Sequence, residues 1–314
     1  MFKNRLFSYL SKELAVNIIE FKKLRGNVYY VRTENDSFIL KGYKELRKLK
    51  VQETFTSSLR KSGFEHSYCF YTNNNQPLYF QNVYYGRMEY IQPNEIPFHY
   101  GHDQDRQEGI DLLKQFHDKT HGLASSYTTL LPQTDLVRKW HHRKIDFMRN
   151  LPQINYHVKK EMTNEFLKWA NFSLHGFVKL KNNLAENQPA ILHGDVAHHN
   201  FLRSSEGELY LIDYDLISIG STAYDMLQYA NRILPFLDWK LSALAEINHL
   251  NNWLNNEAFL YGLLYPADLL REWNRLIRDD EESNPYRTAP IVNMTISQFQ
   301  QRRQFQEEVK SLLK

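Results

Sequence analysis

Hydrophobic and polar positions follow two different patterns along the chain. Up to about residue 91, short runs rich in aromatic and β-branched residues are separated by Asn, Asp and Pro, as in strands. This pattern predicts strands at 27–33, 37–42, 67–72, 78–81 and 84–91, with a hairpin turn at 34–36. Apolar residues at three- and four-residue steps predict one helix at 44–61, so the expected order is strand, strand, helix, strands.

Helical periodicity dominates the rest of the chain. It predicts helices at 104–121, 134–149, 157–182, 222–234, 238–254, 257–278 and near 295–313. One strongly β-like segment, 190–219, interrupts them. The change of pattern predicts a boundary near 92–104 between a small β-rich part and a larger helical part, which indicates an α+β protein.

The composition is that of an ordered globular protein. Of the 314 residues, 42% are hydrophobic, 14% aromatic and 24% charged, whereas disordered chains are poor in aromatic residues. Lys and Arg number 39 and Asp and Glu 36, and the resulting net charge of +3 gives no support for a nucleic-acid partner. Cys69 is the single cysteine, which excludes an intramolecular disulfide and a cysteine-based zinc or iron–sulfur site.

The sequence shows no sign of a secretion signal or a membrane span. Charged residues interrupt the apolar ones throughout 1–14, and no window approaches eighteen uninterrupted apolar residues. We therefore expect a soluble protein of the cytoplasm with no membrane partner.

Candidate chemistry is concentrated in residues 191–215, which read ILHGDVAHHNFLRSSEGELYLIDYD. Two short strands, 201–203 and 208–212, are predicted to pair as a hairpin, which would bring Asn200 and Asp213 together at its open end. Asp195 lies five residues before Asn200, in a loop expected to fold back toward them. Carboxylate and amide oxygens are hard ligands, so this set suits Mg²⁺ carrying a phosphate.

The motifs HGDVAHHN at 193–200 and LID at 211–213 resemble the catalytic and metal-binding segments of the aminoglycoside phosphotransferase/choline kinase family. The resemblance implies transfer of the γ-phosphate of ATP to a hydroxyl group of a small molecule. Asp195 would be the catalytic residue that accepts or orients the acceptor's proton. Asn200 and Asp213 would hold Mg²⁺.

The same resemblance implies a protein-kinase-like fold of two lobes. Residues 1–91 would form a β-rich nucleotide-binding lobe, and 92–314 a mainly helical lobe that carries the catalytic loop and binds the acceptor. Acceptor specificity would lie in segments 134–182 and 236–285, which carry no portable motif.

Further family positions follow the same order along the chain. Lys41, at the end of a predicted strand, would hold the α- and β-phosphates, and Glu53 on the following helix would hold Lys41 in place.

Adenine and phosphate contacts are implied at two further places. The hinge, with Met88, Glu89 and Ile91, would bind the adenine edge through its backbone, and Gly26 would lie in the phosphate loop. The resemblance extends from about residue 25 to 235. Within the family, the chain most resembles the spore-coat-associated kinase-like proteins. This resemblance rests on the segment IDYDLIS and the residues that follow it.

A second hypothesis is a catalytically weak or inactive kinase-like protein with a binding or structural role, for instance in a spore coat. The loop around Gly26 favours it, because kinases commonly use several glycines to bring backbone N–H groups close to the phosphates. The presence of Asp195, Asn200 and Asp213 together favours the enzyme, because a purely structural protein would not need a catalytic base and metal ligands.

A third hypothesis for residues 191–215 is a zinc hydrolase. His193, His198 and His199 together with Asp195 are suitable zinc ligands. This hypothesis leaves Lys41 unexplained, and the ring of His193 is instead expected to bond within its own loop.

The remaining candidates have structural interpretations. Asp215 is either a second metal ligand or a turn residue. Thr222 and Asp225 match a helix-capping pattern, and Asp225 could also brace the catalytic loop, while His117 is expected to be a packing residue. The five tryptophans are expected in the core, with one or two alternatively facing a cationic acceptor.

Overall fold

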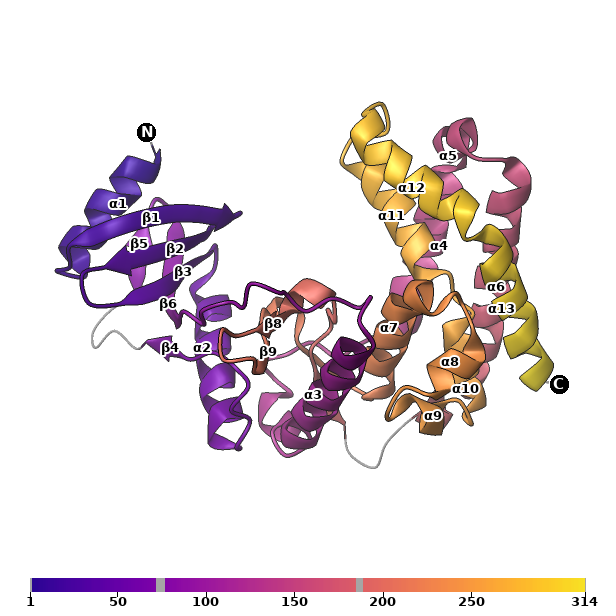
Figure 1. Ribbon diagram of the computed structural model, residues 1–314, viewed down its shortest axis with the longest axis horizontal. Helices are drawn as coiled ribbons and strands as arrows, with labels where there is room; N and C mark the ends of the chain where they lie inside the picture. Colours follow the sequence, from indigo (N-terminus) through magenta and orange to yellow (C-terminus); the bar gives the residue numbers. More distant parts are fainter. Residues whose placement is uncertain (1, 72–76, 185–188, 314) are drawn as a thin grey trace. The chain divides into compact units, whose positions relative to one another are not determined.

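The computed structural model describes residues 2–71, 77–184 and 189–313, which form two compact units (Figure 1). The N-terminal unit comprises Met1–Phe98 and Asn200–Asp215, and the helical unit comprises His99–His199 and Leu216–Lys314. The first unit thus extends to Phe98 rather than 91, and it includes the hairpin of the catalytic segment, which was expected in the helical part.

An antiparallel sheet forms the body of the N-terminal unit, in the order β1-β2-β3-β6-β4 with β5 also on β6 (Figure 1). Its strands are β1 (Ile18–Arg25), β2 (Val28–Thr33), β3 (Ser37–Tyr43), β4 (Phe70–Tyr71), β5 (Leu78–Phe80) and β6 (Val83–Glu89). Helix α1 (Phe2–Glu13) contacts β1 and β5, and helix α2 (Leu46–Lys61) contacts β3, β4 and β6. Leu6, Leu10, Phe21, Tyr29 and Val31 are buried together in the core of this unit.

The predicted strands of this unit are present, and the turn at 34–36 joins β2 to β3. The segment predicted at 67–72 is shorter, since only Phe70–Tyr71 pair, and residue 72 lies outside the described residues. The expected order was wrong at its start, because α1 and β1 precede the predicted elements. Two register shifts interrupt β1 and only Ile18 and Phe21 are buried in it, so its sequence lacks the period of two.

The hairpin expected within residues 191–215 is confirmed. Strands β8 (Phe201–Arg203) and β9 (Leu209–Leu211) are antiparallel, with Phe201 opposite Leu211. The N–H of Ile212 donates to the carbonyl of Asn200 at 2.9 Å, so Asn200 and Asp213 emerge at the same end of the hairpin.

Backbone hydrogen bonds explain why this hairpin belongs to the N-terminal unit. The N–H of Leu211 donates to the carbonyl of His66 at 2.9 Å, and the N–H of Asn94 donates to the carbonyl of Arg203 at 2.8 Å. The ring of Tyr214, just beyond β9, packs edge-on against Phe55 of α2.

The helical unit is built from helices and one small antiparallel pair, β7 (Ala190–Leu192) with β10 (Ser218–Gly220). Its α-helices are α3 (Asp103–His121), α4 (Leu136–Arg149), α5 (Leu151–His157), α6 (Lys160–Leu180), α7 (Ala223–Ile233), α8 (Leu241–Ala245), α9 (Leu250–Trp253), α10 (Glu257–Leu263), α11 (Ala267–Arg278), α12 (Pro285–Ser297) and α13 (Phe299–Leu312). None of the described helices is long and apolar enough to span a membrane.

Two predicted helices of this unit are broken in the structure, and a further observed helix was not predicted. The segment 238–254 is broken into α8 and α9, with Trp239 and His249 at positive φ, and 257–278 is broken at Pro266. Helix α12, which contains Pro290, was not predicted.

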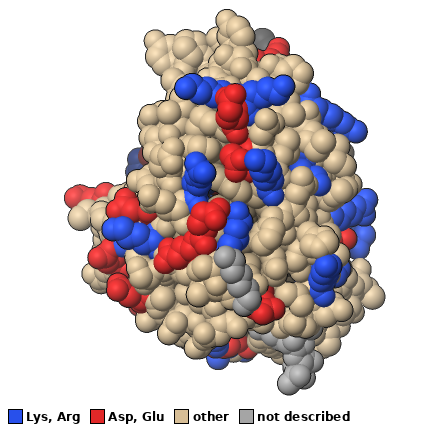
Figure 2. All heavy atoms as spheres, turned by 90° about the vertical axis from the view of Figure 1, so that its right-hand side faces the viewer, with Lys and Arg blue, Asp and Glu red and all other residues tan. Residues whose placement is uncertain are grey.

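Close packing and a charged exterior complete the helical unit. An added Cβ at Gly176 of α6 would lie 2.1 Å from the ring of Tyr261 of α10, so glycine permits this approach of the two helices. Trp140, Trp169, Trp239 and Trp273 are buried, as expected. On the face where α6 and α13 lie, basic and acidic side chains are interspersed (Figure 2).

Candidate active site

Lys41 is the centre of a charged cluster in the N-terminal unit. It lies on β3 with 8% of its surface exposed, and its Nζ contacts Asp213 Oδ1 at 2.8 Å and Asp215 Oδ1 at 2.6 Å. Both aspartates follow β9, and Asp213 has a φ of 70°, a left-handed conformation that Asp tolerates better than most residues. The interpretation of Asp215 as a turn residue alone is therefore incomplete, because it also pairs with Lys41.

The turn that contains Gly26 lies next to this cluster. Arg25 of β1 is opposite Val28 of β2, so two residues, Gly26 and Asn27, make the whole turn. Gly26 has a φ of 44°, which glycine adopts without cost. The carbonyl of Asn27 accepts from the N–H of Gly42, and the guanidinium of Arg25 pairs with Oδ2 of Asp213. The turn thus brings one glycine and one cation to the lysine–aspartate cluster.

Glu53 does not contact Lys41. It pairs with Lys50 on its own helix at 2.7 Å, and the adjacent residue, Gln52, is the one directed inward. Gln52 is 5% exposed and donates to the carbonyl of Tyr214 at 2.6 Å. Asp213 and Asp215 occupy the partner positions around Lys41 that Glu53 was expected to take, so a role of Glu53 toward Lys41 stays a prediction.

The carboxylates around Lys41 influence a neighbouring phenol. Burial, followed by the negative charges of Asp215, Asp213 and Glu53, raises the pKa of Tyr43 well above its ordinary value. The Nζ of Lys41 also lies 5.6 Å from the centre of the Tyr43 ring. The phenol is therefore buried close to both the carboxylates and the cation of the cluster.

The expected hinge residues lie at the end of β6. Met88 is buried, and the N–H of Glu89 donates to the carbonyl of Cys69 at 2.9 Å. Ile91 follows the strand, and its N–H makes no hydrogen bond to any residue that the structure describes. Its backbone is therefore available to an adenine edge.

The donor set fits a magnesium ion. Asn200 is 1% exposed and lies beside Asp213 at the open end of the hairpin, so one end of the hairpin contributes an amide oxygen and the other a carboxylate. Oxygen donors of this kind are those that Mg²⁺ prefers. Arg25, with a side chain that is 57% exposed, is the partner of Asp213 most easily exchanged for such an ion.

The loop around Asp195, in the helical unit, is held by buried hydrogen bonds. Asp225 of α7 is 1% exposed and accepts from the N–H of His193 at 2.7 Å, the N–H of Gly194 at 3.0 Å and Nε2 of His117 at 3.0 Å. Burial opposes its charge, but the hydrogen bond and charge of His117, together with His193, hold the pKa of Asp225 below its ordinary value. The expectation that Asp225 braces this loop is confirmed, whereas capping is not: Thr222 makes no side-chain capping bond.

Gly194 is required by the shape of this loop. Its φ is 78°, and an added Cβ would lie 2.3 Å from the carbonyl oxygen of Leu216. The N–H of Asp195 reaches Nδ1 of His193 at 3.4 Å, which supports the structural role expected for that ring. The carboxylate of Asp195 accepts from Nη2 of Arg232 at 3.0 Å and is 31% exposed, so it is fixed and accessible at once.

The zinc interpretation gains no support. Among the residues that the structure describes, no group of three or more His, Cys, Asp or Glu side chains could hold a metal ion. His193 is fully buried in its loop. Burial, followed by the charges of His199, His99 and Arg232, lowers the pKa of His198.

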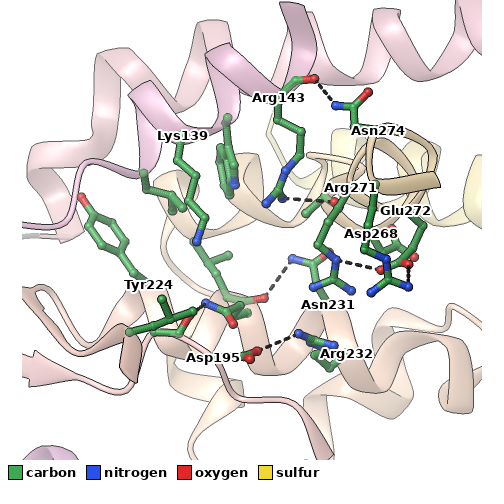
Figure 3. Close-up of a pocket in the computed structure, with 18 of the residues that line it drawn as sticks. Lys139, Arg143, Asp195, Tyr224, Asn231, Arg232, Asp268, Arg271, Glu272 and Asn274 are labelled. Carbon is green, nitrogen blue, oxygen red and sulfur yellow. Dashed lines mark hydrogen bonds and ion pairs between the residues drawn. The ribbon is translucent and has the colours of Figure 1, made fainter. Parts of the chain in front are cut away.

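A cavity of about 640 Å³ opens beside Asp195 in the helical unit (Figure 3). Helices α4, α7 and α11 line it together with the Asp195 loop. This volume is in the range of small-molecule pockets.

The comparisons agree on the architecture. No family model matches the sequence. An aminoglycoside phosphotransferase from Alicyclobacillus acidocaldarius superposes with a TM-score of 0.72 at 16% identity, over 95% of each chain. A spectinomycin phosphotransferase in complex with AMP gives a TM-score of 0.65 at 13% identity over 95% of this chain and 97% of that one. The choline kinase LicA from Streptococcus pneumoniae gives a TM-score of 0.51 at 13% identity over 95% and 98%. The chain has the protein-kinase-like fold of these enzymes.

Two polar residues next to the Asp195 loop, Gln228 and Arg232, were not predicted from the sequence. Gln228 donates to the carbonyl of Gly194 at 3.1 Å and accepts from the N–H of Val196 at 3.3 Å, while Arg232 pairs with Asp195. With Asp225 they stand at positions i, i+3 and i+7 of α7, which lie on one face of a helix. That spacing was the signal available in the sequence.

Proposed function

We propose that this protein is an ATP-dependent kinase that transfers the γ-phosphate to a hydroxyl group of a small molecule. The observation that carries the proposal is the contact of buried Lys41 with Asp213 and Asp215, beside Asn200 and the Gly26 turn. A nucleoside triphosphate requires a cationic side chain for its phosphates and oxygen ligands for its metal ion. The solved structures of the same fold include a phosphotransferase bound to AMP.

Each residue of the N-terminal unit has a role in this proposal. Lys41 binds the α- and β-phosphate oxygens, and the backbone of Glu89 and Ile91, after Met88, binds the adenine edge. Asn200 and Asp213 would hold Mg²⁺, which would neutralise phosphate charge when bound. Arg25, which pairs with Asp213, would then be free to contact the phosphates.

Asp195 is the proposed catalytic residue of the helical unit. The acceptor's hydroxyl oxygen forms a bond to the γ-phosphorus while the bond from that phosphorus to the bridging oxygen of ADP breaks. Asp195 orients the hydroxyl and accepts its proton, which passes to solvent. Arg232 is a positioning residue that holds the Asp195 carboxylate, and Asp225 holds its loop.

A kinase-like binding protein without turnover is the second candidate. The two-residue turn with its single glycine favours it, because few backbone N–H groups are free to approach the phosphates. The resemblance of the sequence to spore-coat-associated kinase-like proteins also favours this candidate.

A thermal-shift titration with ATP and ADP, with and without Mg²⁺, tests the nucleotide site. At a hundredfold excess over the dissociation constant a ligand stabilises by about 2.7 kcal/mol. We expect Mg²⁺-dependent stabilisation of the wild type that is lost in Asp213→Asn and retained in Asp118→Asn, an exposed aspartate paired with Lys114. Nucleotide binding without turnover against any acceptor supports the second candidate, and no binding at millimolar nucleotide rejects the kinase.

A further inference from the structure

The cavity beside Asp195 is rich in basic side chains. Six of the residues that line it are basic and four are acidic, which gives the lining a formal charge of +2. The basic ones are Lys139, Arg143, Arg232, Arg271, Arg275 and Arg278. Figure 3 shows Lys139 and Arg143 of α4 and Arg271 of α11 extending into the same space near Asp195.

Each acidic side chain of the lining already has an arginine partner. Asp195 pairs with Arg232 at 3.0 Å, and Glu272 pairs with Arg271 at 2.9 Å and with Arg275 at 2.6 Å.

The other two acids are paired with arginines outside the lining. Asp268 lies 2.5 Å from Arg302, and Asp146 lies 3.5 Å from Arg149. The four carboxylates therefore leave little negative charge to attract a cationic ligand.

Two of the cations, in contrast, lack a carboxylate partner. Among the described residues, the ammonium group of Lys139 makes no ion pair or hydrogen bond, and the guanidinium of Arg143 donates to the carbonyl of Ala267 at 3.2 Å. They stand four residues apart on α4, so they lie on one face of that helix. Burial, followed by the charge of Arg143, lowers the pKa of Lys139. Both cations therefore gain from a bound anion.

We infer that the acceptor of this kinase is an anion: a small hydroxyl compound whose carboxylate or phosphate group binds Lys139 and Arg143 while its hydroxyl lies at Asp195. This inference deepens the proposed function and rests on it. Aminoglycosides and choline are cations, and a cavity with this charge would repel them. The inferred acceptor therefore differs in charge from aminoglycosides and choline, after which the solved relatives of this fold are named.

Anion binding is measured first, without nucleotide, by calorimetric titration at constant ionic strength. The probes are inorganic phosphate, citrate for the carboxylate class, and spermidine as a cation. We expect one or both anions to bind and spermidine not to bind. Lys139→Gln and Arg143→Gln should each lower the affinity for the anion at least tenfold, which corresponds to about 1.4 kcal/mol in binding free energy. The matched control is Lys144→Gln, a residue of α4 that bonds to Asn171 and does not line the cavity.

Binding that the two variants do not weaken, or a preference for spermidine, would overturn the inference. So would competition by Mg·ADP, because the basic cavity would then be a nucleotide phosphate site. The relative affinities of phosphate and citrate distinguish the two kinds of anionic group.

Turnover separates this inference from the proposed function. ADP release is followed with Mg·ATP and hydroxyl compounds that carry a carboxylate, a phosphate or an amine. Turnover with the amine alone overturns the anionic acceptor and leaves the kinase in place. Variant-sensitive anion binding with no nucleotide binding overturns the kinase and leaves the anion site in place.

Discussion

Lys41 and Asp213 are 172 residues apart in sequence, and their charged groups lie 2.8 Å apart in the N-terminal unit. The hairpin β8–β9 makes this possible, because its backbone is hydrogen-bonded to His66 and Asn94 of the same unit. A buried lysine needs a partner, and two aspartates provide it here. In the proposed function, the phosphates and the metal of Mg·ATP would take the place of these contacts.

Replacing Asp195 with Asn should strongly reduce turnover while nucleotide binding persists. The amide cannot accept a proton, so we expect kcat to fall by about 10²–10⁴ with little change in the Kd of Mg·ADP. Single-turnover kinetics with an identified acceptor and calorimetry with Mg·ADP measure the two effects. Asp118→Asn is the control, and a variant of Asp195 with full phosphoryl transfer would refute the proposed role.

Gly194→Ala should destabilise the helical unit and remove activity. The new Cβ meets the carbonyl oxygen of Leu216 at 2.3 Å, in addition to the strain of a positive φ, so a loss of about 3 kcal/mol or more is expected. Gly207→Ala is the matched control, since Gly207 also has a positive φ but no atom lies within 4 Å of its added Cβ. Equal melting temperatures for the two variants would show that the clash has been relieved by movement of the loop.

Asp225→Asn should cost about 2–3 kcal/mol in the free energy of unfolding at neutral pH, because charge-assisted hydrogen bonds to the Asp195 loop are weakened. Denaturant titration measures this cost, and an unchanged midpoint would show that the charge of Asp225 does not hold the loop. The activity of Asp225→Asn is expected to fall together with its stability, because Asp195 loses its fixed position.

Acid should remove this contribution of Asp225. In the folded protein the pKa of Asp225 lies below the ordinary value of about 3.9 for an aspartate. The carboxyl group therefore takes up its proton in the unfolded state first as the pH falls. The stabilisation is complete above the unfolded pKa and is lost as the pH falls through the folded pKa. The wild type should therefore lose more stability than Asp225→Asn below about pH 4, and parallel curves for the two proteins would contradict this assignment. Asp268, whose pKa is also lowered, contributes equally to both curves.

Local signals in the sequence were sufficient for part of the site. Two strand signals with a polar turn predicted the β8–β9 hairpin, and the hairpin determines where Asn200 and Asp213 emerge. Lys41 was predicted from a strand end and a family motif, and it lies beside these residues. Such features depend on neighbours in sequence, so one chain is enough to find them.

Helix rotation explains why Gln52 rather than Glu53 is directed inward from α2 in this structure. Adjacent helical residues point about 100° apart, and the packing of α2 turns Gln52 inward and leaves Glu53 beside Lys50. The charge of the cavity was also out of reach, because α4 and α11 come together only through tertiary packing. Strand β1 was missed because its bulges remove the period of two.

The most direct test of the account is a calorimetric titration of Mg·ADP into the wild type, Lys41→Met and Lys61→Met. Lys61 is an exposed lysine at the end of α2, so its replacement controls for the loss of one charge. We expect binding to the wild type and Lys61→Met, and a loss of at least tenfold, about 1.4 kcal/mol, in Lys41→Met. Equal affinity in all three proteins would contradict a nucleotide site at Lys41 and, with it, the proposed kinase.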